Sequence, residues 1–289
     1  TSFDVIVWQR SETFFLGRYK GLEEIAFYGM AYNIVAIVVG TVPGAFGRVL
    51  MPALSVRFGL DDHDSLQALY STATRYLALL TLPLCAGGIA LSTEAVRVMF
   101  GLEFAPAGDV MKVLFVGAGI GAIAAAGSAL YIALGQTTIA AAWGLPLAVI
   151  NVLLALVLVP AFGAMGAAVA NSLSQIGGVV AGVVYLTHFR GFRLPLRQLA
   201  RLLLASVPVG LVAYGVVQLL GGLAGLLAGV LAGAMIYILA LILTRALSPR
   251  DFDLLEELAG MFPGAIAGVL RRFVGGVRRF SARPADLHT

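Results

Sequence analysis

Long stretches without charged side chains alternate along the chain with short segments that hold most of the charge. Four stretches contain no Asp, Glu, Lys or Arg: 25–47, 76–93, 113–189 and 202–244. A helix of about 20 apolar residues crosses the hydrocarbon core of a bilayer, where every backbone amide and carbonyl must be paired internally. The pattern therefore predicts membrane-spanning helices, and the two longest stretches must each contain more than one.

Turn residues divide these two stretches. Glycine and proline, which favour turns, occur at Gly135-Gln136, at Pro160 to Gly163 and at Gly221-Gly222. Division there predicts an all-α polytopic membrane helix bundle. It has eight transmembrane spans, at about 3–17, 25–47, 76–93, 113–134, 137–159, 164–187, 202–220 and 223–244. We expect the first span to be truncated, because it is short and the sequence begins at Thr1.

Composition supports a membrane protein. Hydrophobic residues make up 60% of the chain and charged residues only 12%, with a mean hydropathy of +0.96, whereas soluble domains carry about 25% charged residues. This excludes a water-soluble enzyme. The single cysteine, Cys85, lies inside an apolar stretch, so no disulfide framework is expected.

Lysine and arginine are distributed unequally between the two predicted sides. Fourteen lie in the loops 48–75 and 188–201 and in the segment from 245 on. The opposite side has four, and the remaining one, Arg10, lies in the first span. Because cytoplasmic loops are enriched in Lys and Arg, we expect both termini to be cytoplasmic, in the inner membrane of a bacterium.

The organisation expected from this pattern has three parts. Residues 1–187 form a six-helix lobe, 188–244 add two transmembrane helices, and 245–289 form a basic cytoplasmic tail. Within the tail, 264–280 sets apolar residues against arginines in a pattern typical of a helix at the membrane surface. We expect the tail to contact anionic lipid headgroups.

No catalytic or metal-binding constellation is evident in the sequence. The three histidines, His63, His188 and His288, have no partner at metal-ligand spacing. Gly117 and Gly119 lack the strand and the third glycine of a dinucleotide fingerprint. We therefore expect no enzyme activity, no metal, no cofactor and no nucleic-acid partner.

Two charged residues lie inside the first span. An ionised group at such depth costs on the order of 3 kcal/mol on insertion scales, so Arg10 and Glu12 need polar partners. Two positions apart on a helix, they point about 200° apart and cannot pair with each other. One interpretation places them at a hydrated cavity or ligand. The alternative is that Arg10 reaches the membrane surface and Glu12 is paired across helices for folding.

Uncharged polar residues occur in other spans. They are Asn33, Asn151, Asn171, Ser174 and Gln175. Hydrogen bonds between helices explain them most simply. Asn33, Asn171 and Gln175 are also candidates for a substrate cavity.

Four segments resemble a known family. They are Trp8-Gln-Arg-Ser-Glu12 with Leu16-Gly17, Gly29-Met-Ala-Tyr-Asn-Ile through Pro43 to Leu50-Met-Pro-Ala-Leu-Ser55, Leu130 to Gln136, and Asn151 through Pro160, Gly163 and Gly166 to Ala170. Their order and spacing resemble the polysaccharide (lipid-linked oligosaccharide) flippases of the multidrug/oligosaccharidyl-lipid/polysaccharide exporter (MOP) superfamily.

The resemblance implies a fold of two six-helix lobes around a central cavity, often with two added C-terminal helices. The eight predicted spans then match the second lobe with the added pair, and a missing N-terminal lobe is the expected partner. The implied function is translocation of lipid-linked sugars of the pyrophosphoryl polyprenol type, for cell-surface polysaccharide biosynthesis. Arg10 is then the intramembrane cation available to the pyrophosphate.

Two other functions remain open. An ion-coupled multidrug antiporter of the same superfamily would use Glu12 as the acceptor of a proton or sodium ion. In a non-transporting membrane scaffold subunit, every polar group in the spans would only join helices.

Overall fold

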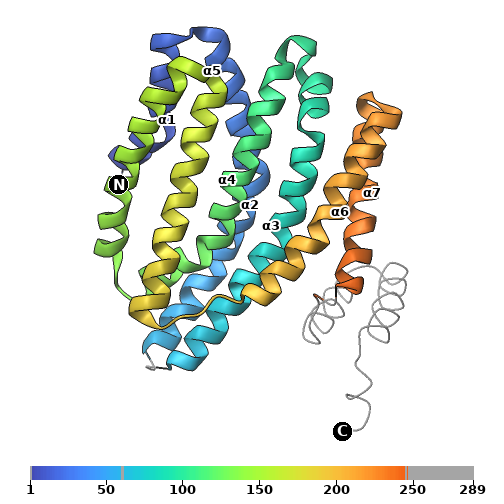
Figure 1. Ribbon diagram of the computed structural model, residues 1–289. Helices are drawn as coiled ribbons and strands as arrows, with labels where there is room; N and C mark the ends of the chain where they lie inside the picture. The colour runs from blue at the N-terminus through green and yellow to red at the C-terminus, as the bar shows by residue number, and fades with distance from the viewer. Residues whose placement is uncertain (1, 60–61, 245, 247–289) are drawn as a thin grey trace.

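The computed structural model describes residues 2–59, 62–244 and 246, and every element in these residues is a helix. Figure 1 shows the long helices side by side. The elements are α1 (Ser2–Tyr19), α2 (Leu22–Gly59), α3 (His63–Phe100), the short 3-10 helix η1 (Leu102–Phe104), α4 (Ala105–Ala133), α5 (Thr137–Arg190), α6 (Leu196–Leu220) and α7 (Gly222–Leu243). The predicted all-α bundle is confirmed.

Six helical segments of the described chain are long and apolar enough to cross a membrane. They are Leu22–Arg48, His63–Phe100, Leu102–Ala133, Gly144–Arg190, Leu196–Leu220 and Gly222–Leu243. With several such helices, the chain is an integral membrane protein.

All three predicted turn positions reverse the chain. Gly135, Gly163 and the Gly221-Gly222 pair have positive φ angles, which glycine adopts readily because it has no Cβ atom. Gly163 divides the 54-residue α5 into two helices, with φ 58° and ψ −135°. In Figure 1, α5 accordingly runs toward one end of the bundle and then returns.

The loop expected at 48–75 is largely helical. Helix α2 continues to Gly59 and α3 begins at His63, where the Asp62 side chain accepts a 2.9 Å hydrogen bond from the Ser65 amide. The prediction used only apolar residues, and a helix can extend past the bilayer because its backbone hydrogen bonds are internal. The helices around this loop are therefore longer than the predicted spans.

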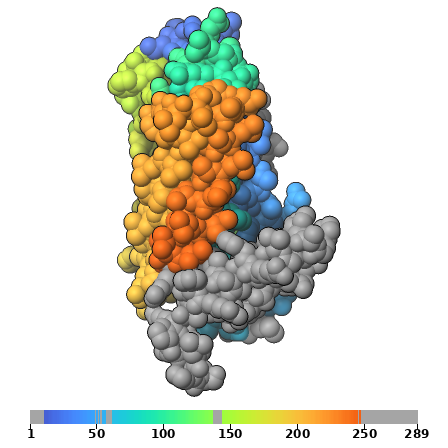
Figure 2. All heavy atoms as spheres, turned by 90° about the vertical axis from the view of Figure 1, so that its right-hand side faces the viewer, coloured from blue at the N-terminus to red at the C-terminus, as the bar shows by residue number. Residues whose placement is uncertain are grey.

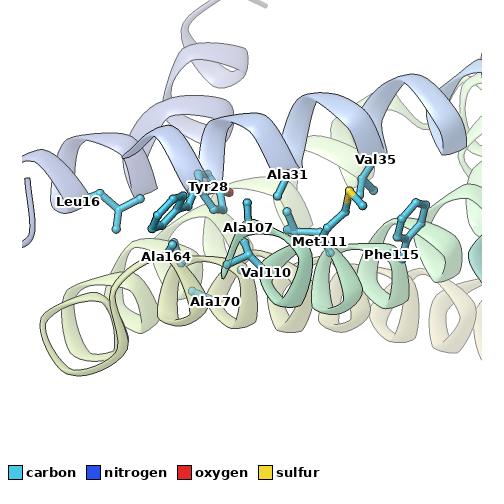
Figure 3. Packing of buried hydrophobic residues seen from close by; sticks show 14 of the residues in the cluster. Leu16, Tyr28, Ala31, Val35, Ala107, Val110, Met111, Phe115, Ala164 and Ala170 are labelled. Atoms are coloured by element: carbon cyan, nitrogen blue, oxygen red, sulfur yellow. The ribbon is translucent and has the colours of Figure 1, made fainter. Parts of the chain in front are cut away.

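Helix α4 lies in the middle of the bundle and packs against α2, α3 and α5. Its glycines allow this: a Cβ atom on Gly117 would lie 2.7 Å from Ser172, and one on Gly119 would lie 2.6 Å from the Cys85 sulfur. Figure 3 shows part of the buried core around α4. It contains Leu16, Tyr28, Ala31, Val35, Ala107, Val110, Met111, Phe115, Ala164 and Ala170.

Helices α6 and α7 form an antiparallel pair that packs on α3. Gly225, Gly229 and Gly233 of α7 are buried and face α6, with Val217 next to Gly225 and Val209 next to Gly233. Figure 2 shows this pair along one side of the molecule. The predicted amphipathic helices of the tail lie outside the described residues.

Candidate functional site

Glu12 of α1 is a charged residue that is completely buried, with 0% of its surface exposed. Its Oε1 atom accepts hydrogen bonds from the side-chain amides of Asn151, at 2.8 Å, and Asn171, at 3.2 Å. The Ser11 hydroxyl donates to Oε2 at 3.2 Å. The carboxyl group is therefore held by α1 and by both halves of α5.

Further hydrogen bonds orient the two asparagines. The Ser174 hydroxyl lies 3.2 Å from Asn151 Oδ1, and Gln175 donates to Asn171 Oδ1 at 2.6 Å. Positions 171, 174 and 175 share one helical face because three or four residues make about one turn. We call Glu12, Asn151, Asn171, Ser174 and Gln175 the Glu12 cluster.

The break at Gly163 brings this cluster together. The chain reverses there, so that Asn151 before the break and Asn171 after it reach the same oxygen. The reversal is fixed by Glu24 of α2, whose Oε2 accepts a 2.6 Å hydrogen bond from the Ala164 amide. A carboxylate in this position satisfies an unpaired amide in the first turn of the second helix and suits its positive end.

The described partners of Glu12 are neutral amides and a hydroxyl. A buried ionised carboxylate requires strong compensation, by hydrogen bonds or an opposite charge. Among the described residues, this compensation comes from the hydrogen bonds of Ser11, Asn151 and Asn171.

A cavity of about 290 Å³ borders the cluster between α2, α4 and α5. Asn171 and Gln175 form its polar wall, and Tyr32 and Pro43 of α2 lie opposite on the lining. The cluster therefore lies next to a space large enough for several water molecules. Within the described residues, no group of three or more His, Cys, Asp or Glu could hold a metal ion.

The structure brings together three of the five predicted site residues. Glu12, Asn171 and Gln175 meet in the cluster. Asn33 is exposed and lies outside it, because α2 buries the neighbouring positions Ala31 and Val35 and position 33 points away from both. Arg10 belongs to α1, and the structure describes its backbone but not its side chain.

Asn151 and Ser174 also belong to the cluster, although the sequence favoured a helix-packing role for them. Both are buried at 1% exposure. The contribution of Glu24 was missed in the sequence, since an acidic residue near the start of a helix usually serves its own helix. The signal available was Gly163, which requires a partner for the amide that follows it.

The described chain is a polytopic helical membrane protein with a buried carboxyl group beside a cavity. Three comparisons with known proteins define its class further. Residues 3–109 match the family model described as polysaccharide biosynthesis protein. The predicted resemblance to the polysaccharide flippases of the MOP superfamily is confirmed.

A curated relative is the "Probable low-salt glycan biosynthesis flippase Agl15" of Haloferax volcanii. It is 24% identical over 206 residues, which cover 71% of this chain and 43% of the relative. The solved structure of the lipid II flippase MurJ, in an inward closed conformation, aligns with a TM-score of 0.69 at 19% identity, covering 82% of this chain and 51% of MurJ.

A MOP superfamily transporter from Pyrococcus furiosus aligns with a TM-score of 0.56 at 16% identity, over 97% of this chain and 66% of that protein. The chain has the fold of part of a MOP superfamily transporter. It spans about half the length of the flippases that it matches.

Proposed function

We propose that this chain is part of a flippase that moves lipid-linked oligosaccharide or polysaccharide precursors across the cytoplasmic membrane for cell-surface polysaccharide biosynthesis. The observation that carries the proposal is the buried Glu12 cluster beside a cavity, in a fold shared with a lipid II flippase. A sugar and a pyrophosphate need polar groups in place of water when they cross the bilayer.

The proposed topology has eight spans. To the six apolar segments it adds α1, and it counts the two halves of α5 separately because Gly163 divides them. Residues 1–187 then form a six-helix lobe and 188–244 an added pair. With both termini in the cytoplasm, the end that carries Arg190, Arg193 and Arg197 is cytoplasmic, in the inner membrane of a bacterium.

An opposing lobe completes the transport pathway in this proposal. The chain spans about half of its relatives, and two lobes that face each other would enclose a polar path between them. The pyrophosphate of a polyprenyl-linked sugar requires cations, and Arg10 on α1 is the candidate. Asn33, exposed on α2, is a candidate for contact with the sugar.

The Glu12 cluster links the helices that this proposal expects to move. Because Asn151 and Asn171 share Oε1, any change at Glu12 alters the contacts of α1 with both halves of α5 at once. These helices are therefore the proposed moving elements.

The test is flipping of a fluorescent polyprenyl-pyrophosphoryl sugar in liposomes that contain the two-lobe protein. Glu12→Gln retains the amide-accepting oxygen but removes the charge, and we expect it to fold and to lose at least tenfold in flipping rate. Glu103→Gln, on the exposed η1, is the matched control and should flip normally. Normal flipping by Glu12→Gln would assign the cluster a purely structural role.

The same liposomes distinguish the two alternatives. A multidrug antiporter would exchange a cationic dye for protons or sodium ions, and its activity would depend on Glu12. MATE transporters align less well with this chain, for example with a TM-score of 0.53. A scaffold subunit would support neither transport reaction.

A further inference from the structure

A second cavity, of about 600 Å³, opens between α3, α4 and α6. We call it the α3–α6 groove. In Figure 1, α6 leans away from α4 toward the end where α3 finishes. Four charged residues line the groove near that end: Glu94, Arg97, Asp109 and Lys112. Its remaining length is lined mainly by apolar side chains of α3 and α6.

The charged rim carries equal numbers of acidic and basic groups. Lys112 contacts Asp109 at 2.7 Å, whereas Arg97 lies 3.8 Å from Glu94, beyond hydrogen-bond distance. The other oxygen of Glu94 accepts a 2.7 Å hydrogen bond from the Gly222 amide at the start of α7. The side chains of Arg97 and Asp109 remain 47% and 59% exposed. Despite their ion pairs, both are therefore accessible to another molecule.

The depth of the rim corresponds to the surface region of a bilayer. Arg97 and Glu94 lie within two turns of the end of α3, or about 5 to 9 Å at 1.5 Å per residue. Tyr214 and Gln218 of α6 line the groove near the end of that helix. Tyrosine is enriched at membrane interfaces, where its ring and its hydroxyl group meet different surroundings.

Below the rim, the groove extends over part of one leaflet. Its α3 wall from Thr93 to Ala86 is about 10 Å of helix, within the roughly 15 Å of half a hydrocarbon core. Val207 and Leu211 of α6 line it and are exposed on the outer surface of the described chain. The lower groove therefore opens toward lipid.

We propose that the α3–α6 groove binds one phospholipid with a zwitterionic, amine-bearing headgroup, of the phosphatidylethanolamine type. The phosphate contacts Arg97 and Lys112, the ammonium group contacts Asp109, and one acyl chain follows the apolar wall. Because the rim is electrically neutral, it complements a zwitterion, whereas an anionic headgroup would meet two carboxylates without a cation of its own. The site is separate from the Glu12 cluster and does not depend on the proposed transport function.

The test is native mass spectrometry of the purified full chain, titrated with phosphatidylethanolamine, phosphatidylcholine or phosphatidylglycerol of identical acyl chains. We expect phosphatidylethanolamine to be retained at least tenfold better than phosphatidylglycerol. Phosphatidylcholine should bind more weakly than phosphatidylethanolamine because its headgroup has no N–H donor for Asp109.

Two variants locate the site. Arg97→Gln with Lys112→Gln should lose about tenfold in phosphatidylethanolamine retention, whereas Arg18→Gln with Lys20→Gln removes two exposed cations that do not line the groove and should have no effect. Ala90→Trp fills the apolar wall and should also reduce retention. The proposal is wrong if phosphatidylglycerol binds as well as phosphatidylethanolamine, or if the Arg97 and Lys112 variant binds like its control while eluting as a single folded species.

Discussion

At the residue scale, Gly163 is a position where both the backbone angle and the surrounding space oppose an added side chain. Its φ of 58° disfavours any residue with a Cβ atom, and that atom would lie 2.5 Å from Glu24 Oε2. We expect Gly163→Ala to destabilise the protein by about 1–3 kcal/mol, measured as an earlier loss of the monomer peak in gel filtration after heating. Gly144→Ala is the control, because a Cβ atom there has open space. Equal thermal stability of the two variants would contradict this account of the α5 reversal.

Glu12→Ala should lower stability more than Glu12→Gln. Alanine leaves the amides of Asn151 and Asn171 without their acceptor, at a cost of about 1–3 kcal/mol for each unsatisfied buried group. Glutamine keeps an oxygen for both. The measurement is the folded yield and heat resistance of each variant in detergent. Ser11→Ala, which removes one hydrogen bond to the other oxygen, should change little.

Two variants of Arg10 separate the effect of its positive charge from that of its hydrogen-bonding geometry. If it contacts a pyrophosphate, Arg10→Lys retains the charge but loses the paired N–H donors. We expect it to keep part of the transport activity and Arg10→Ala to lose ten- to hundredfold in apparent substrate affinity, matching about 1.5–3 kcal/mol. Flipping is normalised to folded protein in the two-lobe transporter. Normal activity of Arg10→Ala per folded molecule would leave Arg10 with a structural role only.

At the element scale, the contact between α6 and α7 depends on small residues. A Cβ atom on Gly229 would already lie 3.2 Å from Leu91 and 3.3 Å from the Ala213 carbonyl oxygen. Gly229→Leu should therefore separate the two helices and expose their contact to proteolysis, whereas Gly215→Leu on α6 has open space and should resemble the parent chain. Limited proteolysis at the α6–α7 turn measures the difference. Similar cleavage of both variants would show that the glycines of α7 are dispensable.

The sequence predicts where helices reverse but not how long they are. Gly135, Gly163 and Gly221 were identified because glycine supports the backbone angles of turns. Charged residues such as Arg48 suggested a loop, yet α2 continues beyond it. A charged residue such as Arg48 indicates where a helix leaves the apolar part of the bilayer. It does not indicate where the helix itself ends, because the backbone hydrogen bonds can continue beyond that point.

The partners of polar residues were harder to predict than their presence. Glu12 was recognised as a buried charge that needs partners, but Asn151 and Asn171 are 139 and 159 positions away. In a membrane helix the face toward lipid is as apolar as the face toward protein, so periodicity does not say which way Asn33 points. Contacts between helices therefore required the structure.

At the scale of the whole molecule, the proposed topology places two ends of the bundle on opposite sides of the membrane. Leu102 in η1 and Leu196 at the start of α6 are 75% and 68% exposed and follow turns at different ends. With Cys85→Ser as background, Leu196→Cys should react with an impermeant thiol reagent only from the cytoplasmic side, and Leu102→Cys only from the opposite side. Labelling of both from one side would overturn the predicted topology.

The long sequence separation within the Glu12 cluster also affects the order of membrane insertion. At a synthesis rate of about 5–20 residues per second, roughly 7 to 30 seconds pass between the synthesis of Glu12 and that of Asn151 and Asn171. During that time α1 carries a carboxyl group whose eventual partners on α5 have not yet been synthesised. The first helix is therefore among the last to become stable in the bilayer, and until α5 has turned back at Gly163 it depends on the insertion machinery or on water at the membrane surface.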